Sequence, residues 1–289
     1  MAVHVLRGGL IGIAETIPGV SGGTIALVTG IYERIIAAGK AITDLPGAAR
    51  GGDFSPALRR IDWKLLIPVA IGMLAAVFLL AGTMESFVTG QPVISKALFF
   101  GMIAVCIAIP LGEIRPGEIK TDKQRKQAWL VFGLFALATF ILTSLPSSEI
   151  SEPPLWLVFI AAAIAICALV LPGVSGSFFL LVIGMYAPTM AAVDQRNIGY
   201  LLVFMLGALT GIVLFVRLLE RLLENHHALT LVAMSGLLLG SLRALWPWQG
   251  PEGQFEGFGD NVFGALLMAL LGALIVGVVA AAQRYFSKR

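Results

Sequence analysis

Two apolar stretches of the chain are interrupted by the same five residues, Pro18-Gly19-Val20-Ser21-Gly22 and Pro172-Gly173-Val174-Ser175-Gly176. Proline cannot continue a helix, and glycine removes the steric barrier to irregular backbone, so we expect a break at both places. The interrupted stretches run over His4–Ala38 and Leu155–Met190. Each is predicted to form two helices joined by a tight turn.

The two breaks belong to an internal repeat with an offset of 154 residues. Nine of the fifteen positions 18–32 are identical to their partners, where chance would give roughly one. Beyond the turn, the identities pair Leu27, Val28, Gly30 and Tyr32 with Leu181, Val182, Gly184 and Tyr186. The repeat divides one integral membrane domain into a first half, residues 1–145, and a second half, residues 146–289.

The composition is that of a membrane protein. Apolar residues make up 58% of the chain and charged residues 13%, against roughly 45–50% and about 25% in soluble domains. Uninterrupted apolar spans are predicted at Trp63–Ala81, Ser95–Leu111, Ala128–Thr143, Tyr200–Leu219, Leu229–Trp246 and Val262–Ala282. The formal charge of +3 does not indicate nucleic acid binding, because the basic residues lie in loops beside these spans. Cys106 and Cys167 lie within apolar runs and predict small core residues rather than a disulfide.

The charge distribution predicts how the spans are oriented. If each broken stretch enters and leaves on one face and every other span crosses once, 16 of the 20 Lys and Arg residues fall on one side. The other side carries Lys96, Arg196 and Arg243, and Arg34 lies within the first broken stretch. The positive-inside rule then makes the first side cytoplasmic and puts both termini there.

Three spans follow each broken stretch, so the second half begins on the opposite face from the first. We therefore predict an all-α polytopic membrane protein of two inverted-topology repeats, each a broken or re-entrant helix pair followed by three transmembrane helices. The first arm, His4–Ile17, is about 21 Å long at 1.5 Å per residue, too short to span the hydrocarbon. That length favours a re-entrant hairpin, whereas the longer arm Leu155–Leu171 could cross fully.

The turns are the first candidate site. After each Pro-Gly-Val, a serine can cap the following helix, and small residues leave backbone N–H groups accessible. A helix start of this kind attracts anions through its donors and the positive end of its dipole. The candidate substrate-binding residues are Ser21, Gly22, Gly23 and Thr24 in the first half and Ser175, Gly176 and Ser177 in the second. The alternative is a helix break required only for packing.

Three ionisable residues lie at or near membrane depth. Glu15 precedes the first break by one turn and could take up a proton during transport, or pair with Arg34 or Arg7. Arg34 could bind substrate or, with Glu33, mark the membrane edge. Arg243 lies in an apolar helix and could meet a phosphate from the outer leaflet or extend to the interface. Glu15 is thus the candidate coupling residue, and Arg34 and Arg243 are candidate substrate ligands.

The sequence lacks the common zinc-hydrolase and nucleotide-binding motifs. The histidines are His4, His226 and His227, and no HExxH zinc motif or phosphate-cradling GxxxxGK[ST] loop is present. We therefore expect a transporter rather than an enzyme, with no metal and no cofactor.

The doubled motif extends into longer strings. They are Arg7-Gly8, Gly12-Ile13-Ala14-Glu15-Thr16-Ile17-Pro18-Gly19-Val20-Ser21-Gly22-Gly23-Thr24, Gly30-Ile31-Tyr32 and Leu171-Pro172-Gly173-Val174-Ser175-Gly176. In these strings the chain resembles the bacterial polyprenyl-phosphate transporter family (PopT) over essentially its whole length. Glu15 stands where such sequences often carry aspartate, which keeps the carboxylate.

The resemblance implies a flippase of the bacterial cytoplasmic (inner) membrane that moves undecaprenyl phosphate, a carrier lipid of cell wall biogenesis, from the outer to the inner leaflet. The expected partners are this lipid phosphate and membrane lipids, with a proton or a cation as coupling ion and a homodimer as a possible assembly. No nucleic acid partner is expected. The residues alone indicate an inverted-repeat transporter suited to anions. A carrier of a small soluble anion, and a membrane enzyme acting on a lipid phosphate, are the alternatives.

Overall fold

The computed structural model describes residues 1–15, 22–50, 54–145, 153–171, 176, 179–180, 183–250 and 254–287. Within these ranges the regular structure is helical, apart from an isolated β-bridge between Gln249 and Phe255. Five of the described helices are long and apolar enough to cross a membrane, or six if the bent pair Phe54–Arg60 and Trp63–Leu79 forms one span. The chain is therefore an all-α polytopic membrane protein, as the sequence predicted.

The helices follow the predicted spans closely. The first half contains α1 (Ala2–Glu15), α2 (Gly22–Val28), α3 (Tyr32–Arg50), α4 (Phe54–Arg60), α5 (Trp63–Gly90), α6 (Pro92–Cys106), α7 (Ala108–Glu113) and α8 (Asp122–Leu142). The second half contains α9 (Leu155–Val170), α11 (Tyr186–Asp194), α12 (Ile198–Asn225), α13 (His227–Ser241), the 3-10 helix η1 (Leu242–Leu245) and α14 (Val262–Ser287).

Each broken stretch has a second break that the prediction of two helices missed. Gly30 has a φ of +69° and Gly184, its partner in the repeat, a φ of +75°. The N–H of the residue after each glycine donates back to the same relative carbonyl, from Ile31 to Ala26 at 3.0 Å and from Met185 to Leu180 at 2.8 Å. This is the glycine-terminated helix end in which a left-handed residue satisfies the last carbonyls. The described parts of the two stretches thus share their backbone geometry as well as their sequence.

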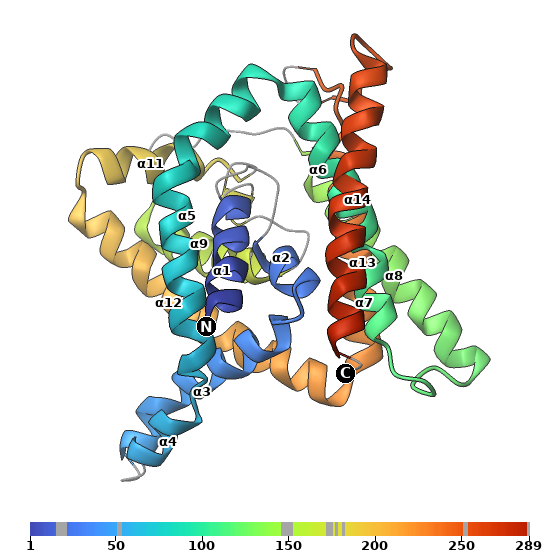
Figure 1. The fold of residues 1–289 in the computed structure, drawn as a ribbon. Helices are drawn as coiled ribbons and strands as arrows, with labels where there is room; N and C mark the ends of the chain where they lie inside the picture. The colour runs from blue at the N-terminus through green and yellow to red at the C-terminus, as the bar shows by residue number, and fades with distance from the viewer. Residues whose placement is uncertain are drawn as a thin grey trace.

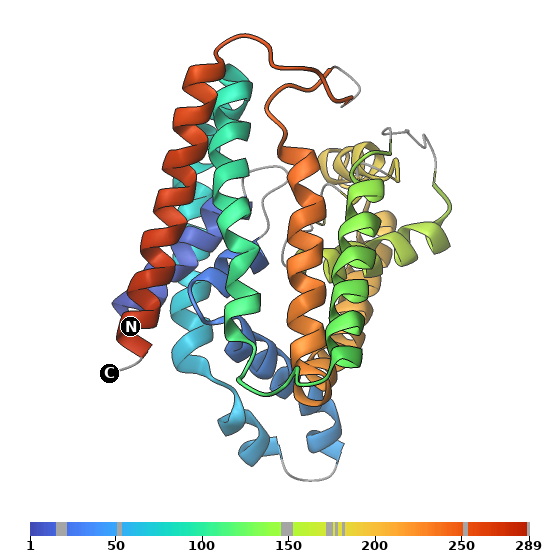
Figure 2. The same cartoon turned by 90° about the vertical axis from the view of Figure 1, so that its right-hand side faces the viewer.

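Four helix pairs pack at backbone contact through glycine. The pairs are α1 with α5, α9 with α12, α6 with α14 and α8 with α13. A Cβ atom at Gly8, Gly207, Gly101 or Gly236 would lie between 1.8 and 2.4 Å from a backbone oxygen of the partner helix. In lipid the hydrophobic effect does not drive helices together, so membrane helices associate through close packing. Small residues at the interface make that packing possible. Figure 2 shows α6 beside α14 and α8 beside α13 as two upright pairs.

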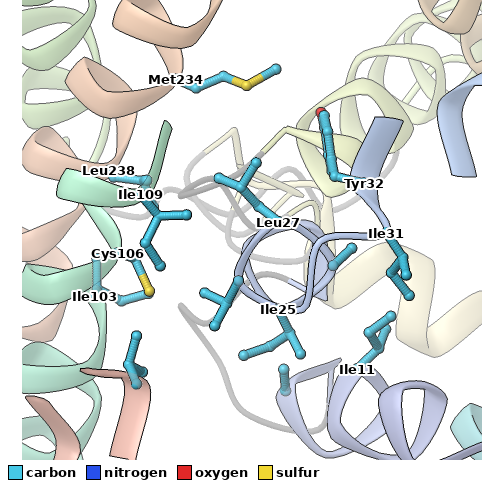
Figure 3. Packing of buried hydrophobic residues seen from close by; sticks show 14 of the residues in the cluster. Ile11, Ile25, Leu27, Ile31, Tyr32, Ile103, Cys106, Ile109, Met234 and Leu238 are labelled. Carbon is cyan, nitrogen blue, oxygen red and sulfur yellow. The ribbon is translucent and has the colours of Figure 1, made fainter. Parts of the chain in front are cut away.

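The short helix α2 lies at the centre of this arrangement. Figure 1 shows α1 and α2 in the middle of the molecule, with α3 and α4 leading toward the lower end and α11 at the upper left. Figure 3 shows the core around α2, where Ile25 and Leu27 face Ile103 and Ile109 of the neighbouring helices. Six of the seven residues of α2 are buried. The structure therefore holds the start of α2 within the bundle.

Candidate substrate site

The start of α2 is occupied by a side chain of the same chain. The Gly22 N–H donates to Oε1 of Glu15 at 3.0 Å, so the carboxylate at the end of α1 binds one of the donors predicted to attract an anion. Gly22 is needed for this contact, because a Cβ there would lie 2.3 Å from the same oxygen. Glu15 is exposed as a whole residue, although α1 ends in the middle of the molecule (Figure 1).

The second half repeats this packing without the carboxylate. A Cβ at Gly176 would meet the Ala165 oxygen at 2.5 Å and the Leu169 Cβ at 3.3 Å. Ala165 and Leu169 stand at the repeat positions of Ile11 and Glu15, which are the residues that a Cβ at Gly22 would meet. Both glycines therefore rest against the corresponding face of the preceding helix, and only the first contact involves an ionisable side chain.

The other predicted turn residues are partly covered by the structure. Gly23 is half-buried, and Thr24 is fully buried within α2. Ser21, Ser175 and Ser177 lie outside the described residues, as do both Pro-Gly-Val turns. Phosphate binding by these five residues, as by Gly22 and Gly176, stays a prediction.

A hydrogen bond links the two broken stretches. The hydroxyl of Tyr32, a residue only 4% exposed, donates to the Val170 carbonyl oxygen at 3.1 Å. Val170 is the last residue of α9, directly before the second break. Sequence reasoning noted Tyr32 only as a repeat identity with Tyr186. Tyr32 follows Gly30, whose positive φ turns the chain so that the Tyr32 side chain points toward the second half. The sequence alone does not give this orientation.

An apolar cavity of about 270 Å³ lies beside this region. We call it the α2 groove. It is lined by residues of α1, α2, α5, α6 and α14, including Ala14, Ile25, Thr29, Phe99 and Val276. Ala14 lines the groove and is followed in the sequence by Glu15. The groove therefore lies next to the hydrogen bond between Glu15 and Gly22. Among its described lining residues Thr29 is the only polar one.

The two predicted arginines lie in different settings. Arg34 forms an ion pair with Asp62 at 2.6 Å, with half of its side chain exposed. Asp62 also accepts from the Leu65 N–H and caps α5, so the pair fixes the junction of α3 and α5. The Arg34 guanidinium holds the pKa of the Asp62 carboxyl below its usual value. The surface pair favours the membrane-edge interpretation of Arg34, and a role in substrate binding stays a prediction.

Arg243 borders a second and larger cavity, of about 530 Å³, which we call the Arg243 groove. Phe100 of α6, Leu137 and Phe140 of α8, and Phe255 contribute to its walls. The Arg243 guanidinium donates to the Thr143 carbonyl oxygen and lies over the Phe255 ring, 5.3 Å from its centroid. The groove thus combines apolar and aromatic walls with a cation held by the backbone and an aromatic face.

Two polar residues beside this groove were missed from the sequence. The Lys96 ammonium donates to the Gln249 amide oxygen at 3.1 Å, and the Gln249 amide nitrogen donates to the Arg243 oxygen at 2.9 Å. Lys96 was counted only as one of the few basic residues on the outer side. Its link to a residue 153 positions later arises because α6 lies beside the segment that follows η1.

Comparisons with known proteins agree with one another. A family model described as undecaprenyl phosphate translocase-like matches residues 11–262. A polyprenyl-phosphate transporter of Vibrio cholerae is 36% identical over 246 residues, which cover 84% of this chain and 77% of that protein. A polyprenyl-phosphate transporter of Staphylococcus aureus is 30% identical over 270 residues, covering 85% of this chain and 86% of that protein. No solved structure matches.

Proposed function

Because the chain belongs to the undecaprenyl phosphate translocase-like family, we infer that it is a transporter of polyprenyl phosphate and not an enzyme. We propose further that it is a flippase for undecaprenyl phosphate in the bacterial inner membrane. The proposed direction is from the outer to the inner leaflet, which recycles the carrier lipid for cell wall biogenesis. The observation that carries the mechanism is the Glu15 carboxylate bound to the first N–H of α2, beside an apolar groove.

The head group is proposed to exchange with Glu15. A carboxylate and a phosphate seek the same backbone donors at a helix start, and the two negative charges repel each other. Arrival of the phosphate near Gly22 therefore favours protonation of Glu15 or its movement away from the Gly22 N–H. A proton or another cation taken up at this moment would offset the charge of the head group while it is at membrane depth. Ser21, Gly23 and Thr24 are proposed to add donors, and Ser175, Gly176 and Ser177 to form the matching site.

The lipid tail is proposed to occupy the α2 groove. Transfer of a charged head group through hydrocarbon costs free energy, whereas an apolar isoprenoid tail can stay in hydrocarbon without such a cost. A groove with a single polar group among its described lining residues suits such a tail and offers nothing to a small hydrated anion. The groove therefore favours the lipid substrate over the soluble anion that composition alone left open.

The two halves are proposed to have inverted topology. The matched breaks at Gly30 and Gly184, and the glycine contacts of Gly22 and Gly176, support the repeat itself. The charge distribution supports cytoplasmic termini.

Thiol labelling of intact cells tests the orientation. A cysteine replacing Gln254 should react with an impermeant reagent, and one replacing Lys123 should not. Labelling of position 123 from outside would contradict the inverted-repeat proposal.

A translocation assay tests the function. Purified protein is reconstituted into vesicles with undecaprenyl phosphate in one leaflet, and the lipid appearing in the other is followed with time. Wild-type protein should move the lipid faster than protein-free vesicles do, and transport should respond to pH. Equal rates with and without protein would contradict the proposal. Loss of the lipid through chemical conversion would instead indicate an enzyme.

A further inference from the structure

The Arg243 groove matches the two chemical parts of a lipid phosphate. Its volume, about 530 Å³, is roughly twice that of the α2 groove. Among its described lining residues Arg243 carries the only charge, and the remainder are apolar or aromatic. An arginine beside apolar walls complements a molecule with an anionic head and a hydrocarbon tail, because each part meets its own kind of surface.

The exposed side chains that line this groove are apolar. Leu137 is 57% exposed, and Phe140 and Leu239, which also line the groove, are exposed as well. Leu137 and Phe140 lie on α8, one of the helices apolar enough to cross the membrane. A ligand that enters between such side chains comes from the bilayer, because a hydrated ion would have to shed its water at an apolar mouth.

The groove also lies apart from the start of α2. Helix α6 separates the two cavities, with Phe100 on the Arg243 groove and the adjacent Phe99 on the α2 groove. The two cavities thus border neighbouring residues of one helix.

We propose that the Arg243 groove is a loading site of the transporter, which takes a polyprenyl phosphate from the bilayer before the head group reaches α2. The proposal rests on the proposed function. The phosphate lies at Arg243 and the first isoprenoid units lie against Phe100, Phe140 and Phe255. The hydrogen bond to the Thr143 oxygen and the Phe255 ring hold the guanidinium at the mouth. Lys96 of α6 donates to Gln249, which in turn donates to the Arg243 carbonyl oxygen.

Farnesyl phosphate, a short polyprenyl phosphate, serves as the probe in a binding assay with purified protein. Leu137→Trp fills the mouth of the groove and should weaken farnesyl phosphate binding about tenfold, about 1.4 kcal/mol. Leu134→Trp is the matched control, because Leu134 is 60% exposed on the same helix but does not line the groove. It should bind as wild type does.

Arg243→Gln tests the charge of the site. It should weaken farnesyl phosphate binding about tenfold and leave binding of uncharged farnesol unchanged.

Each outcome bears on the proposal. Inorganic phosphate should not compete, and an excess of phosphatidylglycerol should compete weakly. Equal competition by phosphatidylglycerol would overturn the loading site in favour of a site for bulk anionic lipid. Wild-type affinity in both Leu137→Trp and Arg243→Gln would overturn it too, and if wild-type vesicles still translocate undecaprenyl phosphate the proposed function stands. Failure of wild-type protein both to bind the probe and to translocate the lipid would overturn the proposed function as well.

A photoreactive farnesyl phosphate gives a second readout that does not depend on variants. Adducts should map to the peptides that carry Phe140 and Phe255. Adducts confined to peptides of α2 would place the probe in the α2 groove alone and overturn the loading site.

Discussion

At the start of α2, Gly22 contacts the Glu15 carboxylate, whereas Gly176 in the second half contacts a backbone oxygen and the Leu169 side chain. The two stretches turn in the same way further on, at Gly30 and Gly184. The glycine-terminated turn is therefore present twice, and the carboxylate at the Glu15 repeat position once. A second carboxylate opposite the first would add a like charge where a phosphate is proposed to bind, which explains why one is enough.

The largest expected effect comes from making the first half resemble the second. Glu15→Leu installs the residue found at position 169 and should lower translocation at least about tenfold, about 1.4 kcal/mol in the barrier. Glu15→Gln keeps an acceptor for the Gly22 N–H, so it should fold normally while turnover fails or loses its pH dependence. Both variants are measured in the vesicle assay at several pH values, with thermal unfolding in detergent as the control for folding.

The rival view makes Glu15 a static partner. In that case Glu15→Gln should chiefly lower the unfolding temperature and leave the pH profile of transport as it was. Wild-type transport with an unchanged pH profile would end the coupling idea.

The next effect should separate the two glycines. Gly176→Ala drives a Cβ toward the Ala165 backbone oxygen, and overpacking of this kind typically costs about 1–3 kcal/mol of stability. Gly22→Ala meets the side chains of Glu15, at 2.3 Å, and Ile11, at 2.9 Å, rather than backbone, and the Glu15 carboxylate can rotate away, so its loss of stability should be smaller. Its loss of transport should be larger, because the carboxylate has been displaced. Equal stability losses for the two variants, measured by denaturation in detergent, would contradict the difference drawn between the halves.

The two repeat tyrosines give a smaller and better matched test. Tyr32→Phe removes the hydrogen bond to the Val170 oxygen and should cost about 0.5–1.5 kcal/mol of unfolding free energy. Tyr186→Phe is the control, because Tyr186 is 39% exposed. It should change stability little. If the two variants lose the same amount, the link between the broken stretches adds nothing to the fold.

The smallest effect is expected at the Arg34–Asp62 ion pair, which the second half lacks because Pro188 stands at the repeat position of Arg34. Arg34 lowers the pKa of Asp62, so the pair stabilises the fold above the unfolded-state pKa and this gain is lost as pH falls through the folded-state pKa. Asp62→Asn keeps an oxygen to cap α5. For a half-exposed pair the loss at neutral pH should be about 0.2–1 kcal/mol. The unfolding curves of wild type and variant should converge in acid, and a constant gap would exclude the ion pair as the cause.

The sequence predicted the helices well and the contacts between them poorly. Hydropathy and the Pro-Gly breaks are local properties, so the spans could be predicted directly. The break at Gly30 was missed because glycine is compatible with a continuing helix, and only its positive φ ends α2. The Glu15 position was predicted to lie near the break, but its Gly22 partner depends on how α1 and α2 pack. The Lys96–Gln249 contact depends on two distant segments meeting, which no local pattern encodes.

The glycine contacts between helices have a mechanical consequence. Where the backbones of two helices touch, sliding one helix along the other would drive a carbonyl oxygen into the backbone of the partner helix. Each of the four pairs should therefore move as a rigid unit. Helix α2 belongs to none of these pairs. It is seven residues long, and a glycine with positive φ follows it closely. Any motion that carries a head group past α2 should therefore occur between the helix pairs. Each pair would turn as a rigid body about the short central helix α2.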